Sequence, residues 1–197
     1  MKKIIAVALT LMMLCGAVSV FADTDMSTPS KTTDDLITFD VTVDNPVDGK
    51  AVVILPINEN TVDDITKYQA NLDAAEKELE KAQNAKTLEA YFGNESSALV
   101  AAILGDNAEI SMDEFLAVIE LGYEDGMGNA LITAQVATPY EKDEKVAAMI
   151  GILKDGSLTW NVYEAVGLED GRIQFTVDAE TMKAIGTEIA LFAVCSK

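Results

Sequence analysis

Residues 146–177 have the sequence VAAMIGILKDGSLTWNVYEAVGLEDGRIQFTV. Three apolar-rich runs lie in this stretch, and Asp155-Gly156 and Asp170-Gly171 separate them. An Asp-Gly pair between apolar runs is a strong local signal for a β-hairpin, because both residues tolerate the positive φ angles that tight turns require. The stretch therefore predicts a three-stranded antiparallel meander, in which the strand that carries Trp160 has a neighbour on each side.

Two further strands and a helix extend this meander. Residues 131–138 and 189–194 are apolar runs of strand length. Between the meander and the last strand, Asp178 stands where a helix N-cap is expected, and Gly186 stands just past residues 179–185. This arrangement predicts a short helix that crosses one end of the sheet.

The region before the meander begins with strand patterns. Ile37, Phe39, Val41 and Val43 alternate with polar residues, which indicates a half-buried strand from Leu36. Residues 51–55 are apolar throughout, which is typical of a strand buried on both faces. Turn residues lie between the two runs, so we expect these strands to pair as a hairpin.

Helical patterns dominate residues 61–122. Apolar residues recur every three or four positions from Ile65 to Ala82, and a second helix is expected over residues 96–104, with Leu99, Val100 and Leu104 on its buried face. The apolar run in residues 110–123 suits either a buried strand or a buried helix. A capping-box pattern at residues 111–114 and Gly122 as a stop favour a third short helix.

These patterns predict an α+β fold, with an antiparallel sheet or a β-sandwich-like module and inserted helices. We expect residues 36–197 to form a single β-rich domain with a helical insertion at about residues 61–122. Residues 23–35 are short, polar and without periodicity, which predicts a flexible leader.

Residues 1–22 carry the features of a secretory signal peptide. Lys2 and Lys3 precede an apolar run from Ile4 to Val20, and Val20-Phe21-Ala22 places small residues at the positions that signal peptidase prefers. The sequence therefore predicts export to the cell envelope or the exterior, with Asp23 as the first mature residue. Lipidation of Cys15 is a weaker interpretation, because Leu14 precedes it in place of a small residue.

The composition limits the partners and the chemistry. The 197-residue chain has a net charge of −19, so nucleic acid and anionic membranes are poor partners. Histidine is absent, which removes the usual near-neutral general base and most catalytic zinc sites. We expect no cofactor, no membrane span in the mature chain, and a protein or glycan as the unknown partner.

One resemblance comes from the C-terminal half. Residues 137–142 (ATPYEK), the turn at residues 154–156, Thr159-Trp160 and the ending at residues 189–196 are similar to a recurring C-terminal module of small exported proteins from anaerobic bacteria. The similarity covers about residues 109–197. That group has no established activity, so the resemblance implies a β-rich module and export, and it transfers no site residues.

A possible metal loop lies between the predicted third helix and the following strand. Glu124, Asp125 and Asn129 supply oxygen ligands beside two glycines, as calcium prefers. The EF-hand spacing fails, because Met127 occupies the third position and Val136 the twelfth. An ordinary turn is the favoured interpretation.

Other side chains could take part in chemistry, but structural roles explain them better. A carboxylate pair for glycoside hydrolysis could come from six scattered acids, although a solvated acidic surface is the simpler explanation. These acids are Asp113, Glu114, Glu120, Glu141, Asp143 and Glu144. Four aromatic residues could build a sugar-binding platform, and they are Trp160, Tyr163, Tyr140 and Tyr123. Trp160 is expected in the core instead, because large aromatic side chains dominate core burial. Cys195 is expected to be a partly buried, inert thiol rather than half of an intermolecular disulfide.

The leading functional hypothesis is an exported, non-enzymatic binding or interaction module. One alternative is a carboxylate-dependent hydrolase that acts on glycans. Another is a structural subunit that assembles by strand addition.

Export gives the first testable prediction. Mass spectrometry of the protein produced in a bacterial host should find Asp23 at the amino terminus of the exported form. Retention of Met1, or a lipid on Cys15, would contradict the signal-peptide interpretation.

Overall fold

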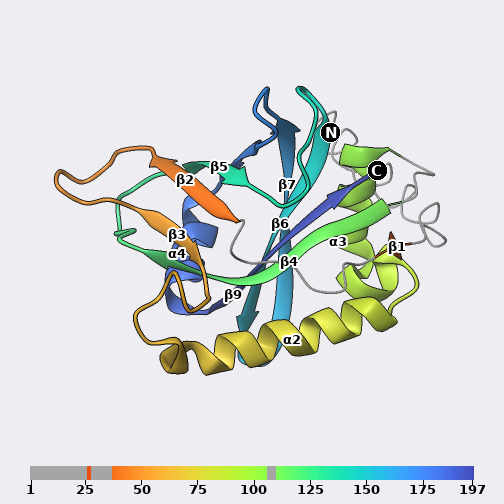
Figure 1. Ribbon diagram of the computed structural model, residues 1–197, viewed down its shortest axis with the longest axis horizontal. Helices are drawn as coiled ribbons and strands as arrows, with labels where there is room; N and C mark the ends of the chain where they lie inside the picture. The colour runs from red at the N-terminus through yellow and green to blue at the C-terminus, as the bar shows by residue number, and fades with distance from the viewer. Residues whose placement is uncertain (1–25, 28–36, 106–109) are drawn as a thin grey trace, which may run out of the picture.

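The computed structural model describes residues 26–27, 37–105 and 110–197 (Figure 1). The predicted signal peptide and most of the predicted leader lie outside these residues. Two leader residues are described, and they form the short strand β1 (Met26–Ser27), which runs parallel to the start of β4 beside Ile110 and Ser111.

Strands from the whole described chain form one sheet, in the hydrogen-bonded order β1-β4-β9-β6-β7-β8-β5-β2, with β3 also paired to β4. Apart from the β1 contact, all pairings are antiparallel. The strands are β2 (Thr38–Val43), β3 (Val53–Pro56), β4 (Ile110–Leu121), β5 (Ala130–Gln135), β6 (Lys145–Lys154), β7 (Ser157–Gly167), β8 (Ile173–Val177) and β9 (Ile189–Ser196). The sheet curls so far that β2 and β3, from its two ends, contribute to the same core.

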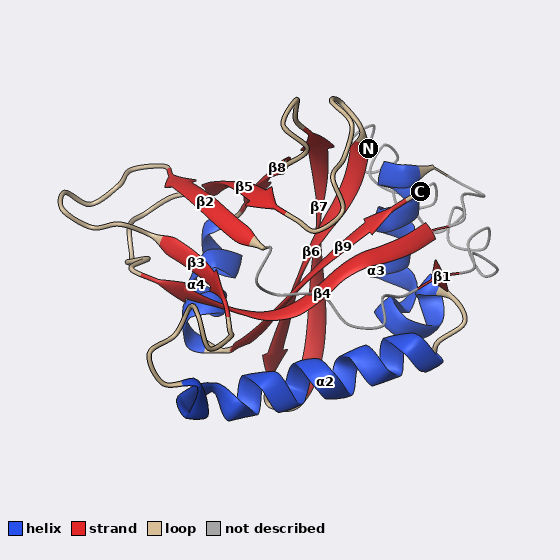
Figure 2. Ribbon diagram, in the orientation of Figure 1, coloured by secondary structure: helices blue, strands red, loops and turns tan. Residues whose placement is uncertain are grey.

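Helices cover both sides of this sheet (Figure 2). A 3-10 turn η2 (Ile65–Tyr68) leads into α2 (Gln69–Asn84), and α3 (Leu88–Leu104) follows it. Both α2 and α3 pack on the convex face, where Ala82, Val100 and Leu104 join an outer core. Helix α4 (Ala179–Thr187) packs on the concave face, where Met182 and Ile185 join an inner core.

The central strands β6 and β9 are buried on both faces. In β9, Phe192 belongs to the inner core, whereas Leu191 and Ala193 belong to the outer core. In β6, Ile150 and Met149 are divided between the cores in the same way. Burial of apolar surface on both faces is the largest stabilising contribution that this sequence can make, and it places the helices above and below these strands.

Trp160 lies in the outer core, as the sequence predicts. Only 7% of its surface is exposed, and its ring makes an edge-to-face contact with Phe92 at a centroid distance of 5.3 Å. The ring also lies directly over Gly151 of β6, where an added Cβ would stand 2.9 Å from the indole. The absence of a side chain at Gly151 therefore makes room for the indole.

The meander and α4 are confirmed, and β7, the strand that carries Trp160, lies between β6 and β8 as predicted, although β8 does not extend along β7 as far as Trp160. Strands β6 and β7 pair along their whole lengths, whereas β7 and β8 share only the pairs Val166 with Gln174 and Gly167 with Ile173. Beside Trp160, the second neighbour is helix α3, whose Ser96 hydroxyl donates to the Trp160 carbonyl at 3.3 Å.

The expected third helix is wrong, because residues 110–121 form β4. Its pairing with β9 contains a bulge between Met112 and Glu114. The bulge shifts the alternation, so that Ile110 and Met112 share the outer face with Phe115 and Ala117. Long-range pairing on both sides outweighs the local capping-box signal, and the helical insertion ends at Leu104 rather than near residue 122.

Two smaller expectations are corrected as well. Strands β2 and β3 do not pair as a hairpin: β2 pairs with β5 and β3 pairs with β4. Strand β3 is buried on one face only, since Val53 is 37% exposed. In α3, Val100 and Leu104 are buried as expected, whereas Leu99 is 49% exposed.

The packing of Trp160 gives a stability prediction. Trp160→Ala should lower the free energy of unfolding by about 3 to 5 kcal/mol, because it leaves a cavity in the outer core. Leu99→Ala is the matched control on the same side of the sheet and should change it by less than about 0.5 kcal/mol. Chemical denaturation of both variants measures the difference, and equal effects would contradict the burial of Trp160.

Candidate functional site

The most distinctive feature of the sheet is the point where β7 and β8 separate. After its two residue pairs with β7, β8 continues along β5, and the chain then turns at Asp178 into α4. Among the described residues, positions 157–165 of β7 therefore have β6 as their only strand neighbour. The edge of a strand thus lies open in the middle of the sheet order.

The register shows which backbone groups face this open edge. Lys154 pairs with Ser157 across the two-residue turn Asp155-Gly156, where both φ angles are positive. Residues that flank such a turn exchange hydrogen bonds, and the pattern then alternates along an antiparallel pair. The backbone N–H and C=O groups of Leu158, Trp160, Val162 and Glu164 therefore point away from β6. The hydrogen bond from Ser96 to the Trp160 carbonyl agrees with this assignment.

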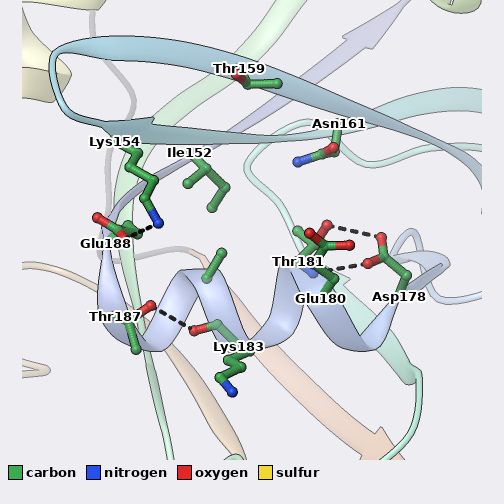
Figure 3. Close-up of a pocket in the computed structure, with 11 residues that line it drawn as sticks. Ile152, Lys154, Thr159, Asn161, Asp178, Glu180, Thr181, Lys183, Thr187 and Glu188 are labelled. Carbon is green, nitrogen blue, oxygen red and sulfur yellow. Dashed lines mark hydrogen bonds and ion pairs between the residues drawn. The ribbon is translucent and has the colours of Figure 1, made fainter.

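A groove of about 650 Å³ lies between this part of β7 and helix α4 (Figure 3). Its strand side carries Ile152, Thr159 and Asn161, and its helix side carries Glu180 and Ala184. The remaining lining residues are Lys154, Asp178, Thr181, Lys183, Thr187 and Glu188. The lining combines polar and apolar surface in about equal parts and includes both donors and acceptors.

Hydrogen bonds fix the end of the groove at the start of α4. Asp178 caps the helix, because its carboxylate accepts from the Thr181 N–H at 2.9 Å. The Tyr163 hydroxyl also donates to this carboxylate at 2.7 Å, and so ties β7 to α4 across the gap that β8 leaves. Burial raises the pKa of Asp178, but the hydrogen bonds from Thr181 and Tyr163 outweigh it, so the pKa lies below its ordinary value.

Ion pairs fix the opposite end. Lys154 pairs with Glu188 at 3.1 Å between the hairpin and the end of α4. Figure 3 shows the Lys183 side chain extending from α4 away from β7, where its ammonium pairs with Asp125 at 2.6 Å. Within the described residues, the Asn161 amide and the Glu180 carboxylate make no hydrogen bond or ion pair, so both are available to a ligand.

The residues of the predicted calcium loop lie outside this groove. Glu124 pairs with Lys50 at 2.9 Å and Asp125 pairs with Lys183, so a lysine already neutralises each carboxylate. The Asn129 carbonyl accepts a backbone hydrogen bond from Asp44. In the described ranges, no group of three acidic or cysteine side chains lies close enough to hold a metal ion.

The scattered carboxylates do not converge on one site. The buried Glu114 carboxylate accepts from the Ala137 N–H at 2.8 Å, which anchors the loop after β5 to the bulge of β4. Asp113 accepts from the Tyr140 hydroxyl at 2.7 Å. Glu144 accepts from the Glu141 N–H at 2.8 Å. Each of these three acids holds a turn or a strand in place.

The four aromatic residues also lie apart, so the predicted sugar platform does not form from them. Tyr140 is buried, and Tyr163 stacks on Phe175 on the concave face, opposite Trp160. The Tyr123 hydroxyl donates to the Met127 carbonyl within the loop after β4. Cys195 is completely buried, and burial raises the pKa of its thiol well above the ordinary value.

The sequence contained a partial signal for the groove. The alternation of Thr159, Asn161 and Tyr163 marks a polar face of β7 that a closed core would not contain. It gave no indication that β8 would leave β7 after two residue pairs, because strand pairing partners are not set by local sequence.

Comparisons of the chain with protein-family models, curated proteins and solved structures found no match. The resemblance of residues 109–197 to an exported bacterial module therefore stays a prediction. Within the described residues, no helix is long and apolar enough to cross a membrane.

The buried Glu120, beneath Gly186 of α4, gives a pH-dependent prediction. Burial raises the pKa of Glu120, and its hydrogen bond from the Tyr123 N–H lowers it by less. A raised pKa favours the protonated form in the folded state. The stability that this group contributes is thus present below its ordinary pKa of 4.5 and is lost as the pH rises through the higher folded value.

Glu120→Gln keeps an acceptor for Tyr123 and removes the buried charge. We expect its stability relative to the natural protein to increase between pH 4 and pH 7. Thermal unfolding across this range measures the trend, with the exposed Glu169→Gln as the control. A difference that does not change with pH would contradict the buried-charge account.

Proposed function

We propose that the protein is an exported, non-enzymatic binding module that takes an extended polypeptide segment along the open edge of β7, above the groove on α4. The observation that carries the proposal is the early separation of β8 from β7, which leaves β7 with one strand neighbour from Ser157 to Ala165 in the part of the chain that the structure describes. Strand addition at such an edge obtains its affinity from main-chain hydrogen bonds, and adjacent pockets provide its specificity.

The geometry around the edge supports this mode of binding. The outward-facing backbone groups of β7 recur at every second position, which is the spacing that an added strand requires, and they belong to Leu158, Trp160, Val162 and Glu164. The Trp160 carbonyl already accepts from Ser96, so an added strand would have to share or replace that bond. Alternate side chains of that strand would point toward the groove, where Asn161 and Glu180 are available as hydrogen-bonding partners.

The charge of the protein limits which polypeptide segments can bind at the edge of β7. The protein carries a net charge of −19, and Asp178 and Glu180 lie together at the start of α4. A neutral or basic segment avoids the electrostatic repulsion that an acidic segment would meet. The lining offers polar and apolar surface in about equal parts, so it can accept side chains of both kinds.

Hydrolysis of glycans is the less favoured function. A glycosidase needs a pair of carboxyl groups, one of which has a raised pKa so that it can act as the acid. In the groove, the pKa of Asp178 is lowered, and Glu188 is paired with Lys154. These two carboxylates are thus engaged in holding α4 and are poorly suited to proton transfer.

Export of the protein is part of the same proposal. It is supported by the features of a signal peptide, which are Lys2, Lys3, the apolar run that follows them and the cleavage motif Val20-Phe21-Ala22. An exported binding module would meet its polypeptide partner in the envelope or outside the cell.

A proline at the open edge tests the proposal. Glu164 is exposed, and its N–H points away from β6, so Glu164→Pro removes an outward donor and leaves the pairing with β6 intact. Glu164→Ala is the matched control, because both variants lose the ion pair with Lys145. The probe is a library of ten-residue synthetic peptides that alternate β-branched and polar residues, and fluorescence anisotropy measures binding.

We expect members of the library to bind. Glu164→Pro should weaken their affinity about tenfold or more, because it removes one main-chain hydrogen bond and disturbs the adjacent ones. Glu164→Ala should change the affinity by less than about twofold. Every second amide of a bound peptide would face β7. N-methylation of that set should abolish binding, whereas N-methylation of the other set should not. Binding that the two variants share equally, or a library without any binder, would contradict strand addition.

A further inference from the structure

We propose that one turn of α3, residues 94–97, is a latch that closes the middle of the open edge of β7 and must open before a strand can add there. The inference rests on the proposed function, because it concerns control of the same edge. The contact that carries it is the hydrogen bond that the Ser96 hydroxyl donates to the Trp160 carbonyl at 3.3 Å.

This contact occupies a position that an added strand needs. The Trp160 carbonyl lies between the outward-facing backbone groups of Leu158 and Val162. A main-chain N–H of an added strand would donate to it at about 2.9 Å, and the Ser96 hydroxyl already stands in that place. The closed latch therefore divides the edge, with Leu158 on one side and with Val162 and Glu164 on the other.

Gly93 provides a hinge at the start of the latch. Helix α3 is interrupted there, because Gly93 has a φ of 77° and a ψ of 168°, which are not helical angles. This region of backbone conformation is essentially restricted to glycine. No atom of a packed neighbour lies within 4 Å of the place where a Cβ would stand at this residue. The chain can therefore change direction at Gly93 without a clash on that side.

The latch is held more weakly than the rest of α3. The first N–H groups of a helical segment have no intrahelical acceptor, so side chains contribute much of the stability of its first turn. Besides the bond from Ser96, the Ser97 hydroxyl donates to the Gly93 carbonyl at 2.7 Å. Further along, Val100 and Leu104 are buried in the outer core. Opening is thus confined to the first turn, and the remainder of α3 stays packed.

An added strand compensates for the contact that opening breaks. Its N–H donates to the Trp160 carbonyl in place of Ser96, whose hydroxyl turns to water. The carbonyl is thus bonded in both states, and no buried acceptor is left unpaired. The apparent affinity of the edge for a strand equals its intrinsic affinity multiplied by the fraction of molecules with an open latch. A closed latch therefore lowers the affinity, and any change that opens it raises the affinity.

Ser96→Ala tests the latch, because it removes the hydroxyl that holds the turn on β7. Asn94→Ala is the matched control: it also places an alanine in this turn, but Asn94 is exposed and the bond from Ser96 to Trp160 remains. Gly93→Ala opens the latch by a different cause, since the closed form needs a backbone conformation that alanine strongly disfavours.

Hydrogen exchange measures the opening without any peptide. Within α3, the N–H groups of Ala98 and Leu99 bond to carbonyls four residues earlier, which belong to the latch. Ser96→Ala should speed their exchange about threefold to tenfold, which is the factor that one modest hydrogen bond contributes. The N–H of Leu104 lies beyond the latch and should keep its rate. Asn94→Ala should change these rates by less than about twofold.

Peptide binding measures the inhibition. The peptide library that tests strand addition is titrated into each protein, and fluorescence anisotropy is recorded. Ser96→Ala and Gly93→Ala should each bind library members at least about threefold more tightly than the natural protein does, because a larger fraction of molecules is open. Asn94→Ala should bind as the natural protein does.

The two measurements separate the failure of the latch from the failure of strand addition. Unchanged exchange of Ala98 and Leu99 in Ser96→Ala would overturn the latch, whether or not peptides bind. Faster exchange without tighter peptide binding would also overturn it, since the turn would then open without controlling the edge. If exchange is faster and no protein binds any peptide, strand addition fails, and the control of binding by the latch is overturned with it.

Discussion

Burial of β6 and β9 on both faces is the constraint on which the rest of the structure depends. Leu191, Ala193 and Cys195 face one core, and Phe192 and Val194 face the other. Strands that are apolar on both faces need a covering layer on each side, because neither face tolerates water. Helices α2 and α3 cover the convex face. On the concave face, α4 and the curled ends of the sheet do so together.

The course of β8 and the position of α4 together account for the groove. Strand β8 shares two residue pairs with β7 and then follows β5 as far as Val177, after which the chain crosses to the concave face as α4. The groove forms on the concave side of the exposed part of β7, where Tyr163 and Asp178 replace the missing strand contact. On the convex side, α3 covers the same part of β7, where Phe92 and Trp160 belong to the outer core.

Much of this fold could be predicted where local signals and tertiary structure agree. The Asp155-Gly156 turn, the β6–β7 hairpin and the cap of α4 at Asp178 follow from local chemistry. Residues 110–121 could not be assigned correctly, because the capping-box pattern ending at Glu114 favoured a helix. In the structure, the Glu114 carboxylate binds the backbone N–H groups of Ala137 and Thr138 instead, which are 23 and 24 residues away. The groove could not be predicted for the same reason, because it depends on which distant segments meet β7.

Amide hydrogen exchange in β7, resolved by residue, tests the central claim most directly. If the edge of β7 is open, the N–H groups of Leu158 and Val162 face away from β6 and should exchange quickly, whereas those of Thr159 and Asn161 pair with β6 and should be protected. The account predicts this alternation along the strand. Uniform protection from Leu158 to Val162 would show that another segment pairs with β7, and would contradict the open edge from which the proposed function is argued.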